Sequence, residues 1–423
     1  MKIMVVGGGG REHAIIKKLK ENKDITEIFA LPGNGGMATD ATLVDIGAKD
    51  IQRQVEFAKA NGIDYAVVAP DDPLVLGAVD ALTDAGIPCF GPNKAAAIIE
   101  GSKVFSKNLM KKYNIPTAEY EVFNDLEKAL EYLETAPIPT VIKADGLALG
   151  KGVIIAETRE DAKNAVRSMM EDKIFGESGN NVVIEEFLTG PEVSVLSFTD
   201  GNVVVPMVSS MDHKRALDGD KGLNTGGMGT VAPNPYYTED IAKECMEKIF
   251  IPTINAMKNE NRTFKGCLYF GLMLTPKGPK VIEYNCRFGD PETQVVLPLL
   301  ESDLLEIMMA TTNGTLAETP VKFSNGAAAC VVMASSGYPS KYESGFELKI
   351  DDSVANKVYV AGAKINDGVL VTAGGRVLGV TDTADDLETA LNKAYENLKS
   401  VKFENAFWRN DIGAKALKAI KGE

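Results

Sequence analysis

The sequence predicts a mixed α/β protein of three domains that begins with a parallel sheet. Its 423 residues are enough for about two to four domains, each with its own core. Over residues 1–100, short apolar runs alternate with helical patterns, as in βαβ units. From Gly101 onward, strands are joined by glycine-rich turns, and the runs CLYFGLMLT and PKVIEYN are typical of an antiparallel pair.

The first domain is predicted over residues 1–102. Its strands are the apolar runs KIMVVG, EIFALPG, DYAVVAP and PCFGP, and helical patterns such as HAIIKKLK and LVLGAVDALTDAG lie between them. This alternation predicts a parallel sheet with helices on both faces.

The second and third domains are predicted over residues 103–320 and 324–423, with a subdomain of the second at about 120–190. Expected helices are SKVFSKNLMKKYN, EKALEYLE and residues 242–257, and expected strands include NVVIEEFL, EVSVLSFTDG and NVVVPMVSS. The third domain has the strands AAACVVMAS, KVYVAGAKI and GGRVLGVT, and then the helix DLETALNKAYENLK. This mixture predicts a small α+β C-terminal domain.

Composition excludes several classes of function. With 45 Lys and Arg against 59 Asp and Glu, the net charge is −14, which disfavours a nucleic-acid partner. Only His13 and His213 are present, so there is little scope for a zinc site or a Ser-His-Asp triad. Small anionic ligands stay possible, because a few local cations can hold them.

The cysteines and the chain's hydropathy point to the cytoplasm. The five cysteines are widely separated and odd in number, which predicts neither a CxxC site nor a disulfide framework. The N-terminal MKIMVVGGGGREH is typical of a buried strand and not of a signal peptide. No run of 18 apolar residues is present, so no membrane span is expected.

Two glycine-rich turns are candidate phosphate sites. In VVGGGGREHA, Gly7–Gly10 lie between a strand and a helix, where backbone N–H groups can converge on an anion. Glu12 interrupts the dinucleotide pattern, so phosphate is favoured over NAD, and a turn without ligand is the alternative. The second turn, VIKADGLALGKGVII, is a hairpin with Lys143 and Lys151, whose alternative is a plain hairpin with solvated lysines.

The stretch VIEYNCRFGDPE is the strongest chemical signal. Alternation along Val281, Glu283 and Asn285 places the last two on one face, where their oxygens suit Mg²⁺. Arg287, Asp290 and Glu292 follow at once, and so many charges at a strand end are costly to bury unless paired or ligating.

Two further stretches have weaker signals. NVVIEEFLTGPEVSV can present strand backbone to a base and Glu192 to ribose hydroxyls, although an ordinary strand and turn is the alternative. MDHKRALDGDKGLNTGGMG is a charged loop that ends in a glycine cluster, which is consistent either with closure over a ligand or with a solvated surface.

Together these motifs resemble the ATP-grasp ligases and, more narrowly, the phosphoribosylamine–glycine ligase (glycinamide ribonucleotide synthetase) family. The resemblance spans essentially the whole chain. It rests on GGGGREHA, PGNGG, EGSK, IPTAEY, VIKADGLALGKGV, IEEFL, DHKR with NTGGMG, and IEYNCRFGDPETQ. It implies an ATP-grasp core with antiparallel sheets and a mobile lid between the two other domains.

The resemblance also implies the reaction. ATP, glycine and 5-phosphoribosylamine would give glycinamide ribonucleotide, ADP and phosphate through a glycyl phosphate, as a step of purine biosynthesis. Mg²⁺ or Mn²⁺ would be held by Glu283 and Asn285, and a cytoplasmic monomer without nucleic-acid or membrane partners is expected.

The implied nucleotide site and catalytic group follow residue by residue. Arg287, Lys143 and Asp212 would be catalytic. Nucleotide binding would involve Lys103, Lys143, Gly146, Gly150, Lys151, Gly152, Glu185, Glu186, Phe187, Leu188 and Glu192. Substrate binding would involve Gly9, Gly10, Arg11, Glu12, Pro70, Asp71, Asp212, Lys214, Asp290, Pro291 and Glu292.

Three positions depart from the family pattern, and three other functions stay open. Gly8 stands where Asn is usual, Asp71 where a Glu is usual, and Gly271 where ATP-grasp enzymes carry another acidic metal ligand. The alternatives are an ATP-grasp ligase with another carboxylate and amine, an NAD-dependent oxidoreductase and an inactive nucleotide sensor.

Overall fold

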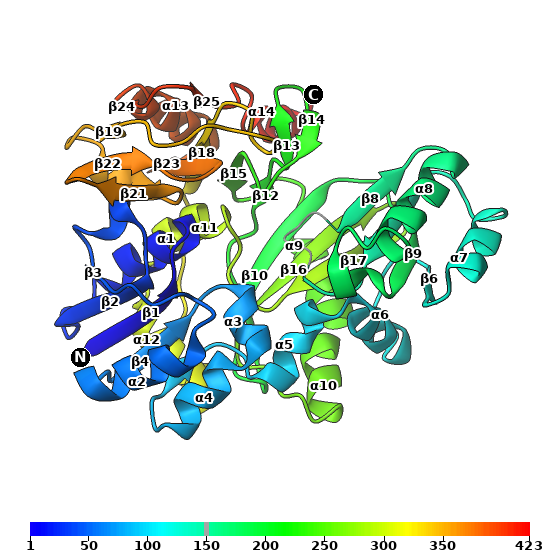
Figure 1. Cartoon of the computed structure of the whole chain (residues 1–423), viewed down its shortest axis with the longest axis horizontal. Helices are drawn as coiled ribbons and strands as arrows, with labels where there is room; N and C mark the ends of the chain where they lie inside the picture. Colours follow the sequence, from blue (N-terminus) through cyan, green and yellow to red (C-terminus); the bar gives the residue numbers. More distant parts are fainter. Residues whose placement is uncertain (148–151) are drawn as a thin grey trace.

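The first hundred residues form a five-stranded parallel sheet in this computed structural model, which describes residues 1–147 and 152–423. The order β3-β2-β1-β4-β5 is the blue part of Figure 1. The strands are β1 Lys2–Gly7, β2 Glu27–Pro32, β3 Thr42–Leu43, β4 Tyr65–Val68 and β5 Cys89–Phe90. The helices are α1 Gly10–Leu19, α2 Ile51–Asn61, α3 Asp71–Leu76, α4 Ala78–Asp84 and α5 Lys94–Gly101.

Strand β1 shows why these runs are apolar throughout. Met4 and Val6 lie in one hydrophobic cluster, whereas Ile3 and Val5 lie in another on the opposite face. Strand order reverses between β1 and β4, so the loops after these two strands diverge. Ligands of open α/β sheets bind in the crevice at such a point, and here residues 8–10 and 70–73 border it.

A four-stranded antiparallel sheet follows, at the right of Figure 1. Its order is β6-β9-β7-β8. The strands are β6 Tyr120–Phe123, β7 Thr140–Ala144, β8 Val153–Ala156 and β9 Val182–Glu186. Helices α7 Leu126–Leu133 and α8 Arg159–Met170 contribute apolar residues to the core of this subdomain.

The central sheet has the order β11-β10-β16-β17 and contains the predicted antiparallel pair. Its strands are β10 Glu192–Thr199, β11 Val204–Pro206, β16 Gly266–Thr275 and β17 Gly278–Asn285. The helix predicted over 242–257 is α9 Glu239–Cys245 and α10 Ile251–Asn259, joined by a π-helical turn at 246–250. Helices α6 Lys103–Lys112, α11 Thr293–Leu299 and α12 Leu304–Asn313 complete this part.

The C-terminal sheet has the order β12-β15-β18-β23-β20, with β25 paired to β18. Its strands are β12 Met211–Asp212, β15 Gly229–Ala232, β18 Ala327–Ser335, β20 Val358–Val360, β23 Arg376–Ala384 and β25 Ala406–Phe407. Helices α13 Leu387–Leu398 and α14 Ala414–Lys421 lie in the same part of the chain. Segments 211–212 and 229–232 therefore join this third sheet, although the sequence predicts them within the second domain, and the domain boundaries stay predictions.

The C-terminal part also contains three small antiparallel pairs, with β13 and β14 at the top of Figure 1 and the other two pairs at its left. They are β13 Arg215–Leu217 with β14 Lys221–Asn224, β21 Ala363–Asn366 with β22 Val369–Thr372, and β19 Lys349–Ile350 with β24 Val401–Lys402. Among the described residues, no helix is long and apolar enough to cross a membrane.

Buried His213 predicts a loss of stability in mild acid. Its Nδ1 lies 3.1 Å from the Gly229 carbonyl and its Nε2 accepts a 3.0 Å bond from the Gly413 N–H, which fits a neutral ring. Burial lowers the pKa of His213 to about 4. Because the unfolded chain binds this proton near pH 6.5, stability falls between pH 6.5 and 4, by about 3 kcal/mol from this group.

Urea unfolding from pH 7 to pH 4 checks this expectation. The variant His213→Gln has no titrating ring and should show a smaller decrease over the same interval. If the free energy of unfolding of His213→Gln falls between pH 7 and pH 4 as much as that of the wild type, His213 is not the group responsible.

Candidate active site

Two buried lysines share one carboxylate on the nucleotide side of the candidate site. Lys143 on β7 and Lys107 on α6 lie 3.0 and 3.2 Å from Glu185 Oε2, whose partner oxygen is buried without a hydrogen bond among the described residues. Burial lowers the pKa of Lys107 to about 8. Sequence reasoning missed Lys107, although it lies four residues after Lys103 and so on the same face of α6.

The start of α6 contacts the glycine-rich hairpin. Ser102 caps the helix, its hydroxyl donates to Asp145 at 3.0 Å, and Lys103 Nζ donates to the Gly146 carbonyl at 2.8 Å. Gly146 has φ +93°, which favours glycine. Of the predicted lid residues, Gly150 and Lys151 lie outside the described residues, and Gly152 directly precedes β8.

The strand predicted to face a base is β9, which ends at Glu186. The Glu186 carboxylate lies 3.3 Å from Lys280 Nζ and accepts a 3.2 Å bond from the Glu119 N–H. Phe187 and Leu188 follow the strand end and are partly buried. Glu192, at the start of β10, lies 3.5 Å from Lys214 Nζ.

Glu283 and Asn285 point away from the core because of a β-bulge that the sequence does not reveal. Gly271 pairs with Glu283 but Leu272 pairs with Val281, so Ile282 is the extra residue. Val281 and Tyr284 both lie in the core. The predicted sharing of one face by Glu283 and Asn285 agrees with this register, whereas placing Val281 on that face is wrong.

The electrostatics of Glu283 favour an ionised carboxylate. Burial alone would raise the pKa of Glu283, but Lys214, Lys143 and Lys103 hold it below its ordinary value. A Cβ added at Gly271 would lie 3.1 Å from the Glu283 Cγ, so a side chain at that position would crowd Glu283. Among the residues that the structure describes, no three His, Cys, Asp or Glu side chains cluster as metal ligands.

Arg287 is held between two acidic residues. Its Nη2 lies 3.0 Å from Glu100 Oε1 and 3.6 Å from Asp71 Oδ2, and its Nε is buried without a partner among the described residues. Burial opposes the charge of Arg287, but Glu100 and Asp71 raise the pKa of its guanidinium overall.

Glu100 is a site residue that sequence reasoning missed. It accepts from Asn285 Nδ2 at 2.9 Å and from the Cys286 N–H at 2.7 Å, so it orients both Asn285 and Arg287. Its only signal was its place in the EGSK string.

A second group of carboxylates is buried beyond Glu283. Glu292 Oε1 accepts from Tyr269 at 3.1 Å and from Ser194 at 3.2 Å. Asp212 Oδ1 is buried without a partner in the described part of the chain. Burial and the nearby Glu292 raise the pKa of Asp212 well above its ordinary value, whereas Glu192 and Glu283 raise that of Lys214.

One pocket is shared by Asp212, Lys214, Glu192 and Glu283. It is lined by Glu192, Val193, Ser194, Asp212, Lys214, Tyr269, Gly271, Leu272, Ile282 and Glu283. The pocket therefore brings together two predicted substrate residues, one predicted nucleotide residue and one predicted metal ligand.

The N-terminal glycine turn borders the same region. Gly9 is the N-cap residue of α1, and its N–H donates to Glu12 Oε2 at 2.6 Å, so the Glu12 side chain closes a capping box. Arg11 donates to Glu12 Oε1 at 2.7 Å and to the Phe288 carbonyl at 3.0 Å. Glu12 is thus engaged within the protein on both oxygens. A Cβ at Gly8 would lie 2.4 Å from the Gly33 carbonyl, so the backbone leaves no room for the usual Asn.

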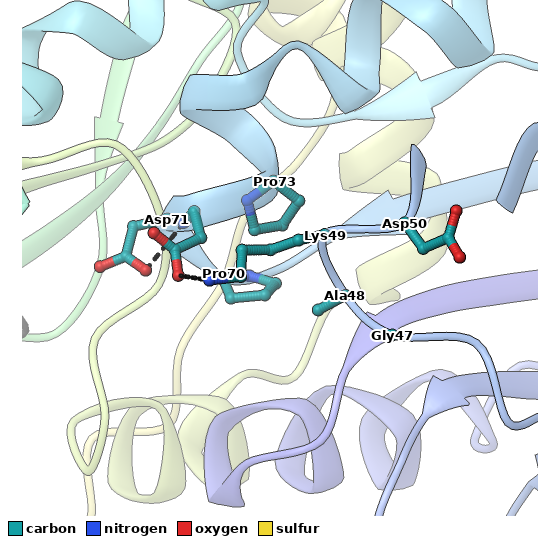
Figure 2. A pocket seen from close by; sticks show the side chains of 8 residues that line it. Gly47, Ala48, Lys49, Asp50, Pro70, Asp71 and Pro73 are labelled. Atoms are coloured by element: carbon teal, nitrogen blue, oxygen red, sulfur yellow. Dashed lines mark hydrogen bonds and ion pairs between the residues drawn. The ribbon is translucent and has the colours of Figure 1, made fainter. Parts of the chain in front are cut away.

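Pro70 and Asp71 line a more open pocket beside this turn. Figure 2 shows them with Pro73 opposite Lys49, whose Nζ lies 3.6 Å from Asp72. The Asp71 carboxylate also accepts from the Asp72 N–H at 2.9 Å. Since Asp71 also lies 3.6 Å from Arg287, this pocket borders the candidate site.

Asp290 and Pro291 contact the predicted closing loop. A Cβ added at Gly227 would lie 2.5 Å from the Pro291 Cδ and 2.6 Å from Asp212 Oδ1. Burial alone would raise the pKa of Asp290, but Arg376 and Arg11 lower it. The turn at 226–227 and the segment after Arg287 are therefore packed together.

Comparison with known proteins identifies three consecutive matches to one family. Residues 1–100, 101–293 and 328–415 match the N domain, the ATP-grasp (A) domain and the C domain of phosphoribosylglycinamide synthetase. A curated phosphoribosylamine–glycine ligase of Clostridium acetobutylicum is 46% identical over 413 residues, covering 98% of this chain and 99% of the relative.

Solved structures agree. The crystal structure of phosphoribosylamine–glycine ligase from Thermotoga maritima has a TM-score of 0.86 and 34% identity, with 97% of this chain and 100% of that chain covered. A biotin carboxylase from Campylobacter jejuni has a TM-score of 0.74 at 14% identity, covering 96% of this chain and 92% of its own, and shares the fold alone.

These findings confirm the predicted ATP-grasp fold class and the prediction of an ATP-dependent ligase. The chain belongs to the phosphoribosylamine–glycine ligase family.

Proposed function

We propose that the site described above joins glycine to 5-phosphoribosylamine through a glycyl phosphate, giving glycinamide ribonucleotide, ADP and phosphate. The observation that supports this most directly is the single pocket in which Glu283 lies with Lys214, Asp212 and Glu192. The carboxylate that would hold the metal ion, Glu283, is thereby adjacent to Asp212, which would bind the amino acid. Transfer of a phosphoryl group from ATP to an amino acid requires these two sites to be neighbours.

ATP would lie between the two antiparallel sheets. Lys103 and Lys143 would neutralise its phosphates, with Gly146 and Gly152 beside them. Glu185, Glu186, Phe187 and Leu188 would border adenine, and Glu192 the ribose. The carboxylate of Glu185 supports this assignment, because it keeps one buried oxygen free while Lys107 and Lys143 occupy the other.

A divalent metal ion, Mg²⁺ or Mn²⁺, would be held by Glu283 and Asn285. Glu283 is ionised, and Glu100 uses the Asn285 amide N–H, so the Asn285 oxygen is the atom left for a cation. Two protein oxygens fit Mg²⁺, which commonly completes its shell with water and substrate phosphates. Bound there, the ion supplies charge neutralisation at the transferring phosphoryl group.

Residues of the chain would bind the ammonium group of glycine and orient its carboxylate. Glu292 is buried, and its charge together with burial raises the pKa of Asp212. Asp212 Oδ1 is buried without a partner in the described part of the chain, which suits the ammonium group of glycine. Arg287 would direct the carboxylate or the transferring phosphoryl group with its fixed fork of donors. The glycine carboxylate attacks the γ-phosphorus, and ADP leaves.

The ribosylamine nitrogen then attacks the acyl carbon, and phosphate leaves. Gly9, Gly10, Arg11, Pro70 and Asp71 border the side from which the amine would arrive. Lys214, Asp290 and Pro291 close the other side, so the acyl phosphate is kept from water.

A coupled assay tests the function. With ATP, Mg²⁺, glycine and phosphoribosylamine generated from ribose 5-phosphate and ammonia, ADP should appear only when both substrates are present. ADP release that does not depend on glycine would contradict the proposal, and a preference for another amino acid would indicate a different substrate pair.

Two other experiments test the remaining expectations. Fluorescence titration with NADH should show no binding of this cofactor. Sedimentation and cell fractionation test the predicted cytoplasmic monomer.

Replacing Glu283 by glutamine tests the metal assignment. We expect the Mg²⁺ concentration for half-maximal activity to rise at least about tenfold, because one charged ligand becomes neutral. The isosteric Glu306→Gln change, at an exposed position of α12 outside the candidate site, is the matched control and should leave the metal dependence unaltered. Equal metal dependence in Glu283→Gln and the wild type would exclude Glu283 as a ligand.

A further inference from the structure

Arg376 reaches the substrate side of the site from the C-terminal sheet. It is the first residue of β23. Its Nη1 lies 2.8 Å from the Gly226 carbonyl, 3.1 Å from the Asp290 carbonyl and 3.3 Å from Asp290 Oδ1. One guanidinium therefore joins the closing loop to the segment that follows Arg287.

The glycine turn is shaped around this side chain. A Cβ added at Gly226 would lie 2.9 Å from the Arg376 Cζ, so the guanidinium packs directly on the turn. On the other side of the turn, Gly227 is packed against Pro291 and the carboxylate of Asp212. The position of Asp212 thus depends on the turn that Arg376 holds.

Asp290 extends the connection to the first domain. Its Oδ1 also accepts from Gln294 Nε2 at 2.9 Å, and a Cβ at Gly9 would lie 3.4 Å from its Oδ2. Loop 226–227, the 290–294 segment and the N-terminal glycine turn therefore meet at Asp290, with Arg376 as the cation on the C-terminal side.

We propose that Arg376 is a positioning residue for ligation, by which the C-terminal sheet holds Asp212 and Asp290 in place around glycine and the incoming amine. This inference rests on the proposed function. An arginine suits the task because its planar fork can serve several acceptors at once, which a lysine ammonium does with less geometric order.

Another buried arginine of the same part of the chain provides the contrast. Arg409 pairs with Asp220 at 2.9 Å and with Asp411 at 2.8 Å, and so anchors the β13–β14 hairpin. Its partners are hairpin and C-terminal residues. Arg376 instead bonds the two segments that border Asp212.

Steady-state kinetics of Arg376→Met and Arg376→Lys test the proposal. For Arg376→Met we expect kcat/KM for glycine to fall about 100-fold while KM for ATP changes less than about twofold. ADP release should exceed product formation, because a misplaced acceptor side exposes the acyl phosphate to water. Arg376→Lys should have a kcat/KM for glycine about tenfold higher than that of Arg376→Met, since lysine restores the charge but not the planar fork of donors.

Two further variants keep the test decisive. Gly226→Ala leaves the charge of Arg376 intact but displaces its guanidinium, and should give the same glycine-specific defect. Lys357→Met removes the 2.9 Å ion pair with Asp382 in the C-terminal sheet and serves as the matched control, with wild-type kinetics expected.

The outcomes separate the alternatives. Wild-type kinetics in Arg376→Met, or an equal fall of all parameters together with a lower melting temperature in every Arg376 and Gly226 variant, would overturn the positioning role. A wild-type chain that does not ligate glycine would instead overturn the proposed function itself.

Discussion

Arg287→Ala is expected to abolish turnover while ATP still binds. Glu100 and Asp71 engage Nη2 of Arg287, whereas its Nε is buried without a partner among the described residues, so Nε is a donor that the proposed function leaves for the carboxylate or the transferring phosphoryl group. Losing one preorganised cation of this kind typically reduces kcat by about 10²–10³-fold or more. Nucleotide affinity should change little, because Lys103 and Lys143 are untouched.

The same change should destabilise the fold. Glu100 is buried, and burial already raises the pKa of its carboxyl, with Arg287 as the cation that opposes this. Removing one partner of a buried pair leaves an uncompensated charge, at a cost of about 3 kcal/mol. The double change Arg287→Ala with Glu100→Gln should regain part of that stability without regaining turnover.

Turnover, ATP binding by titration calorimetry and urea unfolding measure the three effects separately. Arg53→Ala is the control, since the Arg53 side chain is exposed on α2 and its ion pair with Asp50 is 3.8 Å long. Turnover of Arg287→Ala within a few-fold of the wild type would refute the assigned role.

Local motifs were readable from the sequence because their chemistry is concentrated in short stretches. Glu283, Asn285 and Arg287 lie at alternate positions of one five-residue stretch, and the alternation of a strand already indicates that they face one side. Asp212 and Lys214 likewise precede a loop that ends in a glycine cluster. The parallel order of the first sheet followed from its alternating pattern of strands and helices.

The supporting residues were not readable, because their partners are remote in sequence. Glu100 contacts Asn285 across 185 positions, and Arg376 contacts Gly226 across 150. The bulge at Ile282 shows another limit, since strict alternation would place Val281 beside Glu283. Only pairing with β16, including the small Gly271, determines where the register shifts.

Gly227→Ala is expected to have the second large effect on ligation. Gly227 has φ +116°, which side chains rarely adopt, and strain in such a region costs about 1–3 kcal/mol. In addition, the new methyl group would be 2.6 Å from Asp212 Oδ1 and 2.5 Å from the Pro291 Cδ. Asp212 or Pro291 must move, so we expect kcat/KM for glycine to fall about 100-fold or more.

The effect should be confined to the amino-acid side. The neighbours of an added Cβ at Gly227 are Pro291 and Asp212, both on the amino-acid side, so the affinity for ATP is expected to stay within about twofold of the wild type. Glycine-dependent ADP release and ATP titration calorimetry distinguish the two. If the affinity for ATP and kcat/KM for glycine fell by similar factors, the role given to this turn would be wrong.

The variant Gly62→Ala distinguishes the two effects of Gly227→Ala, namely backbone strain and the clash of the new methyl group with Asp212 and Pro291. Gly62 also has a positive φ, +62°, at the end of α2, but a Cβ there would meet nothing within 4 Å. Its replacement should cost about 1 kcal/mol of stability and leave glycine kinetics unchanged. If Gly62→Ala and Gly227→Ala destabilise the fold alike while only the latter impairs ligation, the defect arises from the contact with Asp212 and Pro291, because the strain is common to both.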